Sequence, residues 1–305
     1  MAEFSIIDTY FNRKSSHSVD LGVGDDSALL TPPPQQQLVI CADTLVAGRH
    51  FPLNTSPHAI GWKSVAVNLS DIAAMGAKPQ SILLALSLPQ IDHDWLKGFS
   101  QGLYDCCDQF GVSLIGGDTT QSPHLTISVT ALGWVDIGQA VTRATAQVGD
   151  LICVSGTVGD AAFALQHLGH PLQRRLDYPT PRCELGQALK GLAHSMIDVS
   201  DGLAQDLSHI LKASHVGATL QLDQLPINST LQDLTREQQW QYALAGGDDY
   251  ELCFTISPQN YEKLLQQQNH SSIKVIGKID AESGLRFQQN GLDHSLQFTG
   301  YQHFA

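Results

Sequence analysis

The chain has 305 residues, of which 42% are hydrophobic, so it is long enough for two domains that each bury a core. Its formal net charge of −13 argues against a nucleic-acid partner, because nucleic-acid phosphates require a basic surface. No apolar run approaches the roughly 20 residues that cross a bilayer, and no basic segment precedes an apolar one near the start. We therefore expect neither a membrane span nor a secretory signal.

The first half of the chain alternates predicted strands and helices. We predict a buried strand at 38–42 that ends at Asp43. A helix is predicted to begin at Pro57, after the cap residue Ser56, and to end near Gly76. The remaining predicted elements are a strand at 81–88, a helix at 92–110, and strands at 112–115 and 125–134.

Gly149 and Asp150 begin a second series of elements. We predict strands at 151–155, 218–222, 250–256 and 273–279, and helices at 158–168, 203–213 and 261–267. Three prolines at 171–183 indicate a loop or the approach to a helix. Placing the boundary near 137–149 gives an N-terminal domain over 1–140 and a C-terminal domain over 148–305, in an α/β (α+β) chain.

The six cysteines contain no C-x-x-C pair, which argues against a zinc site or a redox motif. Most of them are expected to be small apolar core residues of a protein in a reducing compartment, so we expect a cytoplasmic location.

Acidic residues stand beside glycine or serine where predicted apolar strands end. These turns are Gly24-Asp25-Asp26, Asp43, Gly116-Gly117-Asp118, Asp198 with Ser200-Asp201-Gly202, and Gly246-Gly247-Asp248-Asp249. Turn formation alone would explain any one of them, but five similar turns favour function. Clustered carboxylates repel unless cations neutralise them, and hard oxygen ligands without a matching His/Cys set select Mg²⁺ or Ca²⁺.

The predicted helix from Pro57 places Ser64, Asn68 and Asp71 on one face, at i, i+4 and i+7. The face is narrow and its side chains are short. A solvated stripe or a cap-like hydrogen bond would explain it, but we favour a metal or phosphate site.

Other enzyme motifs are missing from the sequence. No G-x-x-x-x-G-K-[ST], G-x-S-x-G or H-E-x-x-H occurs. Gly22-Val23-Gly24 lacks the third glycine of a dinucleotide fingerprint and is followed by two acids that would repel pyrophosphate.

At these residues the sequence resembles the thiamine-monophosphate kinase family, in the superfamily of aminoimidazole ribonucleotide synthetase and selenophosphate synthetase. The matching stretches are GVGDDSALL (22–30), ADTLVAGRHF (42–51), AVNLSDIAAMGAKP (66–79), LIGGDTT (114–120), TRATAQVGD (142–150), IDVSDGLAQDL (197–207), GGDDYELCF (246–254) and GYQHF (300–304). The resemblance implies a homodimer built on N-terminal mixed sheets, and a C-terminal α/β sandwich domain that completes the active-site cleft. It also implies transfer of the γ-phosphoryl of ATP, held by several Mg²⁺ ions, to thiamine monophosphate, which gives thiamine diphosphate.

The resemblance assigns roles position by position. The metal-binding acids it implies are Asp26, Asp43, Asp71, Asp118, Asp198 and Asp201. The implied ATP contacts are Gly117, Asp118, Arg143 and Ser200, the implied substrate contacts are His50, Asp248 and Tyr301, and Asp43, Asp118 and Arg143 are the implied catalytic residues. The chain departs from the family at Cys41-Ala42, where Ser/Thr-Thr is common, and at Asp248, where Glu is common.

The implied chemistry needs no covalent intermediate. The acceptor is a phosphate monoester with a second pKa of ~6, so it is already a dianion near neutral pH. Charge neutralisation and in-line alignment are then the main requirements. The alternatives are another synthetase of the superfamily, which forms an acyl-phosphate-like intermediate, and a non-catalytic module that binds nucleotide and metal. Consumption of ATP in the presence of thiamine monophosphate distinguishes the kinase from the binding module.

Overall fold

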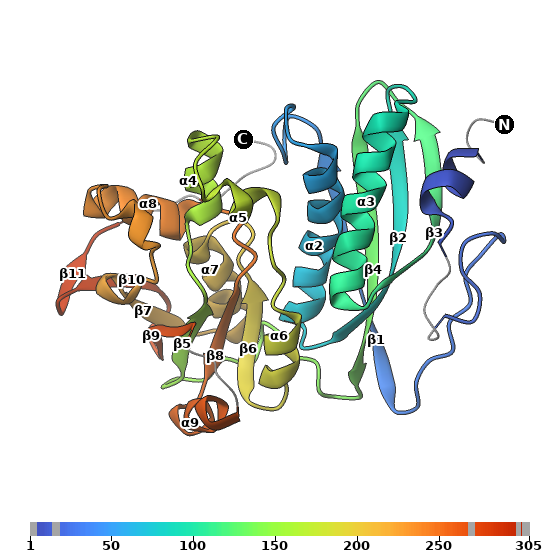
Figure 1. Cartoon of the computed structure of the whole chain (residues 1–305). Helices are drawn as coiled ribbons and strands as arrows, with labels where there is room; N and C mark the ends of the chain where they lie inside the picture. The colour runs from blue at the N-terminus through green and yellow to red at the C-terminus, as the bar shows by residue number, and fades with distance from the viewer. Residues whose placement is uncertain (1–4, 14–18, 268–271, 297–299, 301–305) are drawn as a thin grey trace. The chain divides into compact units, whose positions relative to one another are not determined.

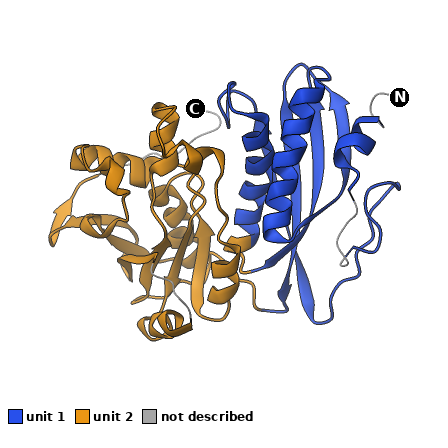
Figure 2. Ribbon diagram, viewed as in Figure 1, with its two compact units in different colours: residues 1–72, 77–138 blue, residues 73–76, 139–305 orange. Residues whose placement is uncertain are grey.

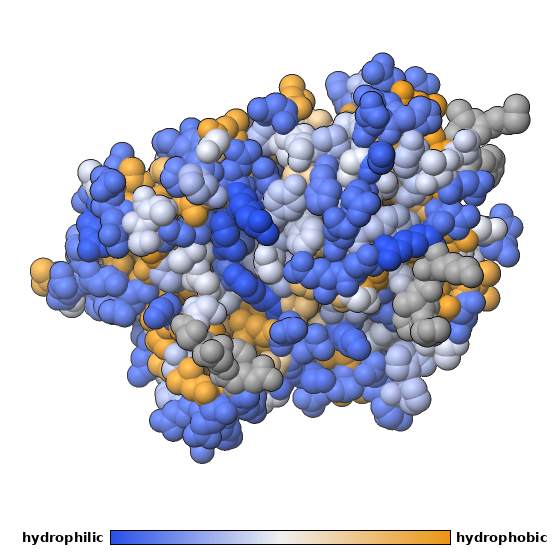
Figure 3. All heavy atoms as spheres, in the orientation of Figure 1, coloured by the Kyte–Doolittle hydropathy of each residue, from blue (hydrophilic) through white to orange (hydrophobic). Residues whose placement is uncertain are grey.

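The computed structural model describes residues 5–13, 19–267, 272–296 and 300. Tyr301, an expected substrate contact, lies outside the described residues. The chain divides into two compact units (Figure 2): unit 1 comprises Met1–Ile72 and Ala77–Gly138, and unit 2 comprises Ala73–Gly76 and Gln139–Ala305. Among the described residues no helix is both long and apolar enough to cross a membrane. The face drawn in Figure 3 is mostly hydrophilic, with scattered apolar residues.

Unit 1 is a four-stranded mixed sheet in the order β1-β4-β2-β3, covered on one face by two helices that lie side by side (Figure 1). Strands β2 and β3 run parallel, and the other pairs are antiparallel. The elements are η1 (Ile7–Phe11), β1 (Gln36–Val46), α2 (Pro57–Ala74), β2 (Lys78–Leu88), α3 (His93–Phe110), β3 (Ser113–Gln121) and β4 (Thr126–Asp136).

The two helices of unit 1 confirm the expected spans and ends. Asp92 caps α3, because its Oδ1 accepts the N–H groups of Asp94 and Trp95 at 3.0 Å, and Gly111 ends α3 with a φ of 67°. Glycines allow α2 and α3 to approach closely. A Cβ on Gly102 would lie 1.9 Å from a carbonyl oxygen of α2, so no other residue fits there without moving a helix.

Several predicted strands are longer than expected, among them β1 and β3, and one prediction of burial is wrong. β1 continues past Asp43 to Val46, and alternate side chains of β1, including Leu38 and Ile40, are exposed. The helices cover only one face of the sheet, so β1 has the alternating pattern of a half-buried strand. β3 likewise continues to Gln121, which places Asp118 inside the strand and not after it.

Unit 2 is a seven-stranded sheet in the order β11-β10-β7-β9-β5-β8-β6, in which only the β10–β7 pair among the described strands is parallel. Its strands are β5 (Leu151–Ser155), β6 (Ala193–Asp198), β7 (Gly217–Gln221), β8 (Leu252–Ile256), β9 (Ile273–Asp280), β10 (Gly284–Gln289) and β11 (Leu292–His294). Its helices are α4 (Asp160–Gln166), α5 (Gln173–Asp177), α6 (Cys183–Leu189), α7 (Leu203–Ser214), η2 (Leu222–Gln224), η3 (Ser229–Leu231), α8 (Arg236–Ala245) and α9 (Pro258–Gln267).

The main core of unit 2 lies between the sheet and its helices, where residues such as Ile152, Leu207 and Leu220 are fully buried. A smaller cluster around Phe163 packs α4 against α5 and Leu231. The segment at 171–183 contains the short helix α5, which the prolines around it obscured in the sequence. The α/β class expected from the sequence is confirmed in both units.

Candidate functional site

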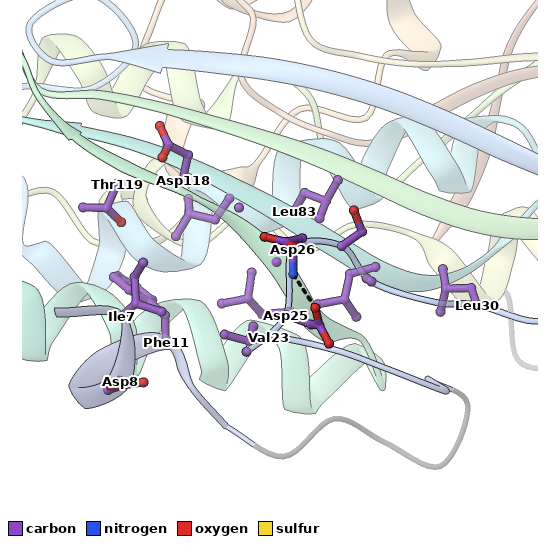
Figure 4. Close-up of a pocket in the computed structure, with 18 of the residues that line it drawn as sticks. Ile7, Asp8, Phe11, Val23, Asp25, Asp26, Leu30, Leu83, Asp118 and Thr119 are labelled. Carbon is purple, nitrogen blue, oxygen red and sulfur yellow. Dashed lines mark hydrogen bonds between the residues drawn. The ribbon is translucent and has the colours of Figure 1, made fainter. Parts of the chain in front are cut away.

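A cavity of about 950 Å³ in unit 1 brings together two of the predicted acids, Asp26 and Asp118 (Figure 4). Asp26 comes from the loop before β1, and Asp118 comes from β3. Asp25 shapes the loop, because its Oδ1 accepts the N–H of Asp26 at 2.8 Å. The remaining wall is mostly apolar and includes Phe11 and Leu83. The cavity therefore combines a largely apolar lining with carboxylates from three segments: Asp8 of η1, Asp25 and Asp26 of the loop before β1, and Asp118 of β3.

Gly117 lines the same cavity and can only be glycine. Its φ is 149°, and a Cβ built on it would lie 1.8 Å from the carbonyl oxygen of Leu84 in β2. The predicted Gly-Gly-Asp stretch thus lets β3 approach β2 closely immediately before Asp118. This arrangement exposes backbone beside a carboxylate, as expected for a phosphate contact.

Asp43 and Asp71 form a second acidic group of unit 1, around Cys41. The pKa of the Cys41 thiol is raised by burial and then by the negative charges of Asp71 and Asp43. The carboxylates of β1 and α2 therefore both lie near this thiol. The sequence placed Asp43 and Asp71 in one role, and the structure brings them into one neighbourhood.

The helix face of Ser64, Asn68 and Asp71 has a different use from the one we favoured. Ser64 and Asn68 are buried, and each donates a side-chain hydrogen bond to a carbonyl of its own helix, to Gly61 and Ser64 respectively. Asn68 Oδ1 also accepts the N–H of Asp43 at 3.0 Å. Asn68 thus joins α2 to β1 and Ser64 is bonded within α2, so Asp71 is the residue of the three that we keep as a candidate ligand.

His50 follows β1 in a tight turn. Its ring Nδ1 accepts the backbone N–H of Val46 at 3.0 Å, and its backbone N–H donates to the carbonyl of Val46. An accepting Nδ1 places the proton of the neutral ring on Nε2. His50 is therefore held as a tautomer whose Nε2 is a donor, which suits an anionic oxygen.

In unit 2, Asp198 is the last residue of β6, and Ser200 and Asp201 lie in the turn between β6 and α7. One carboxylate oxygen of Asp206 accepts three consecutive N–H groups of this turn, those of Ser200, Asp201 and Gly202, at 3.0, 3.1 and 3.1 Å. Burial, followed by the charge of Asp198, raises the pKa of Asp206 to about 8. Asp206 was not singled out from the sequence, although an acid in the first turn of a predicted helix is a known signal for such a contact.

The turn at 246–251 lies against the Asp198–Asp201 turn within unit 2. The N–H of Asp248 donates to the carbonyl of Ser200, and the N–H of Tyr250 donates to that of Val199, both at 2.9 Å. A Cβ on Gly247 would lie 2.2 Å from the carbonyl oxygen of Ser200. The structure therefore brings Ser200 and Asp248, predicted from two distant motifs, into backbone contact.

The other two acids of this turn point into unit 2. Asp249 accepts the N–H of Gly159 at 2.6 Å, and burial raises its pKa well above the usual range. Glu251 is fully buried and accepts hydrogen bonds from Ser155, Arg175 and Arg182. Asp249 thus anchors the turn to the interior of unit 2, whereas Asp248 is half-buried.

Arg143 lies in the loop between the two sheets' strands β4 and β5, and its side chain is exposed. Its carbonyl oxygen accepts the hydroxyl of Ser214 at 2.8 Å. This contact fixes the backbone of the loop at Arg143. The role of its guanidinium as an ATP contact stays a prediction.

Two family matches cover most of the chain. Residues 24–135 match the AIR synthase related protein, N-terminal domain, and residues 147–290 match the AIR synthase related protein, C-terminal domain. The thiamine-monophosphate kinase of Haemophilus influenzae is 44% identical over 100% of this chain and 98% of its own length. That of Escherichia coli strain K12 is 45% identical over 99% and 98%.

Solved structures agree with these relatives. Thiamine-monophosphate kinase from Stenotrophomonas maltophilia superposes with a TM-score of 0.84 at 46% identity, covering 90% of this chain and 92% of that one. The structure of AaThiL complexed with AMPPCP and TMP superposes with a TM-score of 0.77 at 28% identity, covering 90% and 89%. The chain belongs to the thiamine-monophosphate kinase family of AIR synthase related proteins.

Proposed function

We propose that this chain transfers the γ-phosphoryl of ATP to thiamine monophosphate and so produces thiamine diphosphate. The observation that carries the proposal is its match to thiamine-monophosphate kinases along its whole length, at 44–45% identity. A relative that binds AMPPCP, an ATP analogue, together with TMP supports the same pair of substrates. The cavity that holds Gly117 and Asp118 supplies a place for a phosphate-bearing ligand in unit 1.

We assign the predicted acids to Mg²⁺. Asp26, Asp43, Asp71 and Asp118 of unit 1, and Asp198 and Asp201 of unit 2, would provide carboxylate oxygens. Among the described residues no group of three His, Cys, Asp or Glu side chains could hold a metal ion. Mg²⁺ is commonly bound through one or two carboxylates together with waters and substrate phosphates, so a group of three such side chains is not required. When bound, Mg²⁺ neutralises phosphate charge and helps to align the transferred group.

The remaining residues act by binding and orientation. The backbone at Gly117, the side chain of Ser200 and the forked donors of Arg143 would contact the phosphates of ATP. The Nε2–H of His50 would donate to an anionic oxygen of the acceptor. The acceptor is a phosphate dianion near neutral pH, so no side chain has to remove a proton. Asp248 would face its cationic thiazolium, and Tyr301 would stack on its pyrimidine.

We further propose that two copies associate through the open face of the unit 1 sheet and that the dimer works in the reducing cytoplasm. Leu38 and Ile40 are 42% and 58% exposed on that face, which supports its burial by a second copy. The six cysteines are free thiols, which supports a reducing compartment. Sedimentation of the wild type and of an Ile40→Lys variant tests the dimer: the variant should sediment as a monomer.

A turnover assay tests the activity. With ATP and Mg²⁺, thiamine monophosphate should be converted to thiamine diphosphate, and ADP should appear in equal amount. Asp43→Asn and Asp118→Asn should nearly abolish turnover while the thermal unfolding transition is kept. Free thiamine should be a poor acceptor, since its alcohol is not ionised and the proposed site has no base for it. ATP binding without ADP release would favour the non-catalytic module instead.

A further inference from the structure

The turn at 246–251 has an unusual backbone. It contains Asp248 with a φ of 67° and Tyr250 with a φ of 52°, two of the five non-glycine residues with positive φ in the described part of the chain. This conformation is tolerated by Asp but is uncommon for a bulky residue such as Tyr. Strained backbone of this kind persists where surrounding contacts enforce it, and it is frequent at ligand sites.

The contacts that enforce the turn leave Asp248 at its edge. Asp249 and Glu251 are buried and bonded inside unit 2. The N–H groups of Asp248 and Tyr250 are both donated to the neighbouring β6–α7 turn, and Val199 returns a hydrogen bond to the carbonyl of Glu251 at 2.8 Å. The backbone is therefore fixed on both sides, and the Asp248 side chain is carried on a rigid support.

Tyr250 is also hydrogen-bonded to the carboxylate of Asp248. Its hydroxyl donates to Asp248 Oδ1 at 2.9 Å, and Tyr250 is only 8% exposed. A hydrogen bond from a phenol to a carboxylate is charge-assisted, so it restricts rotation of the carboxylate strongly. Aspartate is one methylene shorter than glutamate and has less freedom to search for a ligand. Its orientation therefore matters more to the contact that it makes.

We propose that Tyr250 is a positioning residue that orients Asp248 toward the cationic part of the acceptor and so contributes to acceptor specificity. This inference rests on the proposed function, in which Asp248 contacts that acceptor. In this role the hydroxyl of Tyr250 acts through Asp248, to which it donates a hydrogen bond. Its hydroxyl should consequently influence the acceptor and not the nucleotide.

The test is Tyr250→Phe, which removes the hydroxyl and keeps the ring. We expect the KM for thiamine monophosphate to rise about tenfold, the size expected for loss of one hydrogen bond to a charged group, with the KM for ATP within about twofold of wild type. Tyr242→Phe is the matched control. It removes a hydroxyl that donates to Gln166 Oε1 at 2.7 Å on the exposed side of unit 2, and both KM values should stay unchanged.

A double-mutant cycle separates positioning from a structural effect. In the Asp248→Ala background, adding Tyr250→Phe should change the KM for thiamine monophosphate no further. An undiminished effect in that background, an equal rise in both KM values, or failure of Tyr250→Phe to fold would overturn the inference. If the wild type turns over thiamine monophosphate and the Tyr250→Phe variant has unchanged KM values, the positioning role of Tyr250 is overturned and the proposed function stands. Absence of wild-type turnover would overturn the proposed function and this inference with it.

Discussion

Asn68 Oδ1 accepts the backbone N–H of Asp43 at 3.0 Å. A buried side-chain amide of α2 therefore fixes the backbone of Asp43, a proposed metal ligand on β1. Asp43 lies on β1 at the edge of the four-stranded sheet, and its N–H faces away from β4. The side chain of Asn68 thus substitutes for a missing neighbouring strand. This one contact therefore contributes both to the stability of unit 1 and to the position of Asp43.

Asn68→Ala should lower the free energy of unfolding by about 1–3 kcal/mol, because it leaves polar groups of a buried site without their partner. Urea denaturation measures this loss. Asn12→Ala is the control in the same unit, since the side-chain amide of Asn12 donates to the exposed Asp8 carboxylate at 3.3 Å, and it should change the unfolding free energy by less than about 0.5 kcal/mol. Equal losses in the two variants would show that the Asn68–Asp43 contact contributes little.

Arg143→Lys should raise the KM for ATP and lower kcat, together reducing kcat/KM by roughly tenfold or more. Lysine keeps the charge but loses the planar fork of donors that matches a phosphate in two places. Steady-state kinetics with varied ATP check this, and Arg174→Lys is a suitable control on α5 of unit 2. Unchanged KM and kcat for ATP in the Arg143 variant would remove Arg143 from the nucleotide site.

The raised pKa of Asp206 predicts that the free energy of unfolding depends on pH. Its pKa is raised from 3.8 to about 8, chiefly by burial. Between these two values the folded state keeps a proton that the unfolded state has lost, so the contribution of Asp206 is fully present below about pH 4 and is lost as the pH rises through about 8. The stability of the wild type relative to Asp206→Asn should therefore fall with rising pH, by at most ~1.4 kcal/mol per unit.

Urea denaturation of both proteins at pH 5.5, 7 and 8.5, with a chelator present, measures this difference. The Asn variant does not titrate at this position, so other ionisable groups cancel in the comparison. A difference that stays constant with pH would mean that the three N–H groups keep Asp206 ionised in the folded state despite its burial.

The regular elements could be predicted where the local signals agreed. The helix at 93–110 combined apolar spacing with a cap at Asp92 and an end at Gly111, and the strand at 151–155 had an uninterrupted apolar run. α8 was missed because Arg236–Ala245 has little apolar periodicity, although its capping box at Thr235 and Gln238 was readable. β6 was missed because its first half, Ala193-His194-Ser195, contains two polar residues and leaves a short apolar run.

The site was predictable only in part, for a physical reason. Acids beside glycines can be recognised locally, because the turn and the ligand chemistry both depend on neighbouring residues. One partner is distant in sequence, since Asn68, which holds Asp43, comes from another element. Asp206 and Tyr250 are close in sequence to the residues they hold, but their contacts depend on how the turns fold back. Residue spacing alone does not encode those contacts.

Cys41 provides a measure of the Asp43–Asp71 group that needs neither metal nor turnover. Of the six cysteines it alone is not buried, and its pKa is raised by burial, Asp71 and Asp43. The thiolate is the reactive form, so the folded protein should be alkylated at Cys41 by iodoacetamide more slowly than a free thiol at pH 7.5. Asp71→Asn removes one of the charges that oppose ionisation and should speed the reaction about threefold to tenfold.

Mass spectrometry of the labelled peptide follows the rate at Cys41 separately from that at the buried cysteines, which should react only on unfolding. Asp136→Asn is the matched control, because Asp136 pairs with Gln36 at the far end of β1 and should leave the rate at Cys41 unchanged. A faster reaction in the Asp71 variant alone places its carboxylate beside the thiol, and hence beside Asp43. Equal rates in wild type and the Asp71 variant would mean that the two acids do not share one neighbourhood, and the assignment of Asp43 and Asp71 to a common Mg²⁺ would then be wrong.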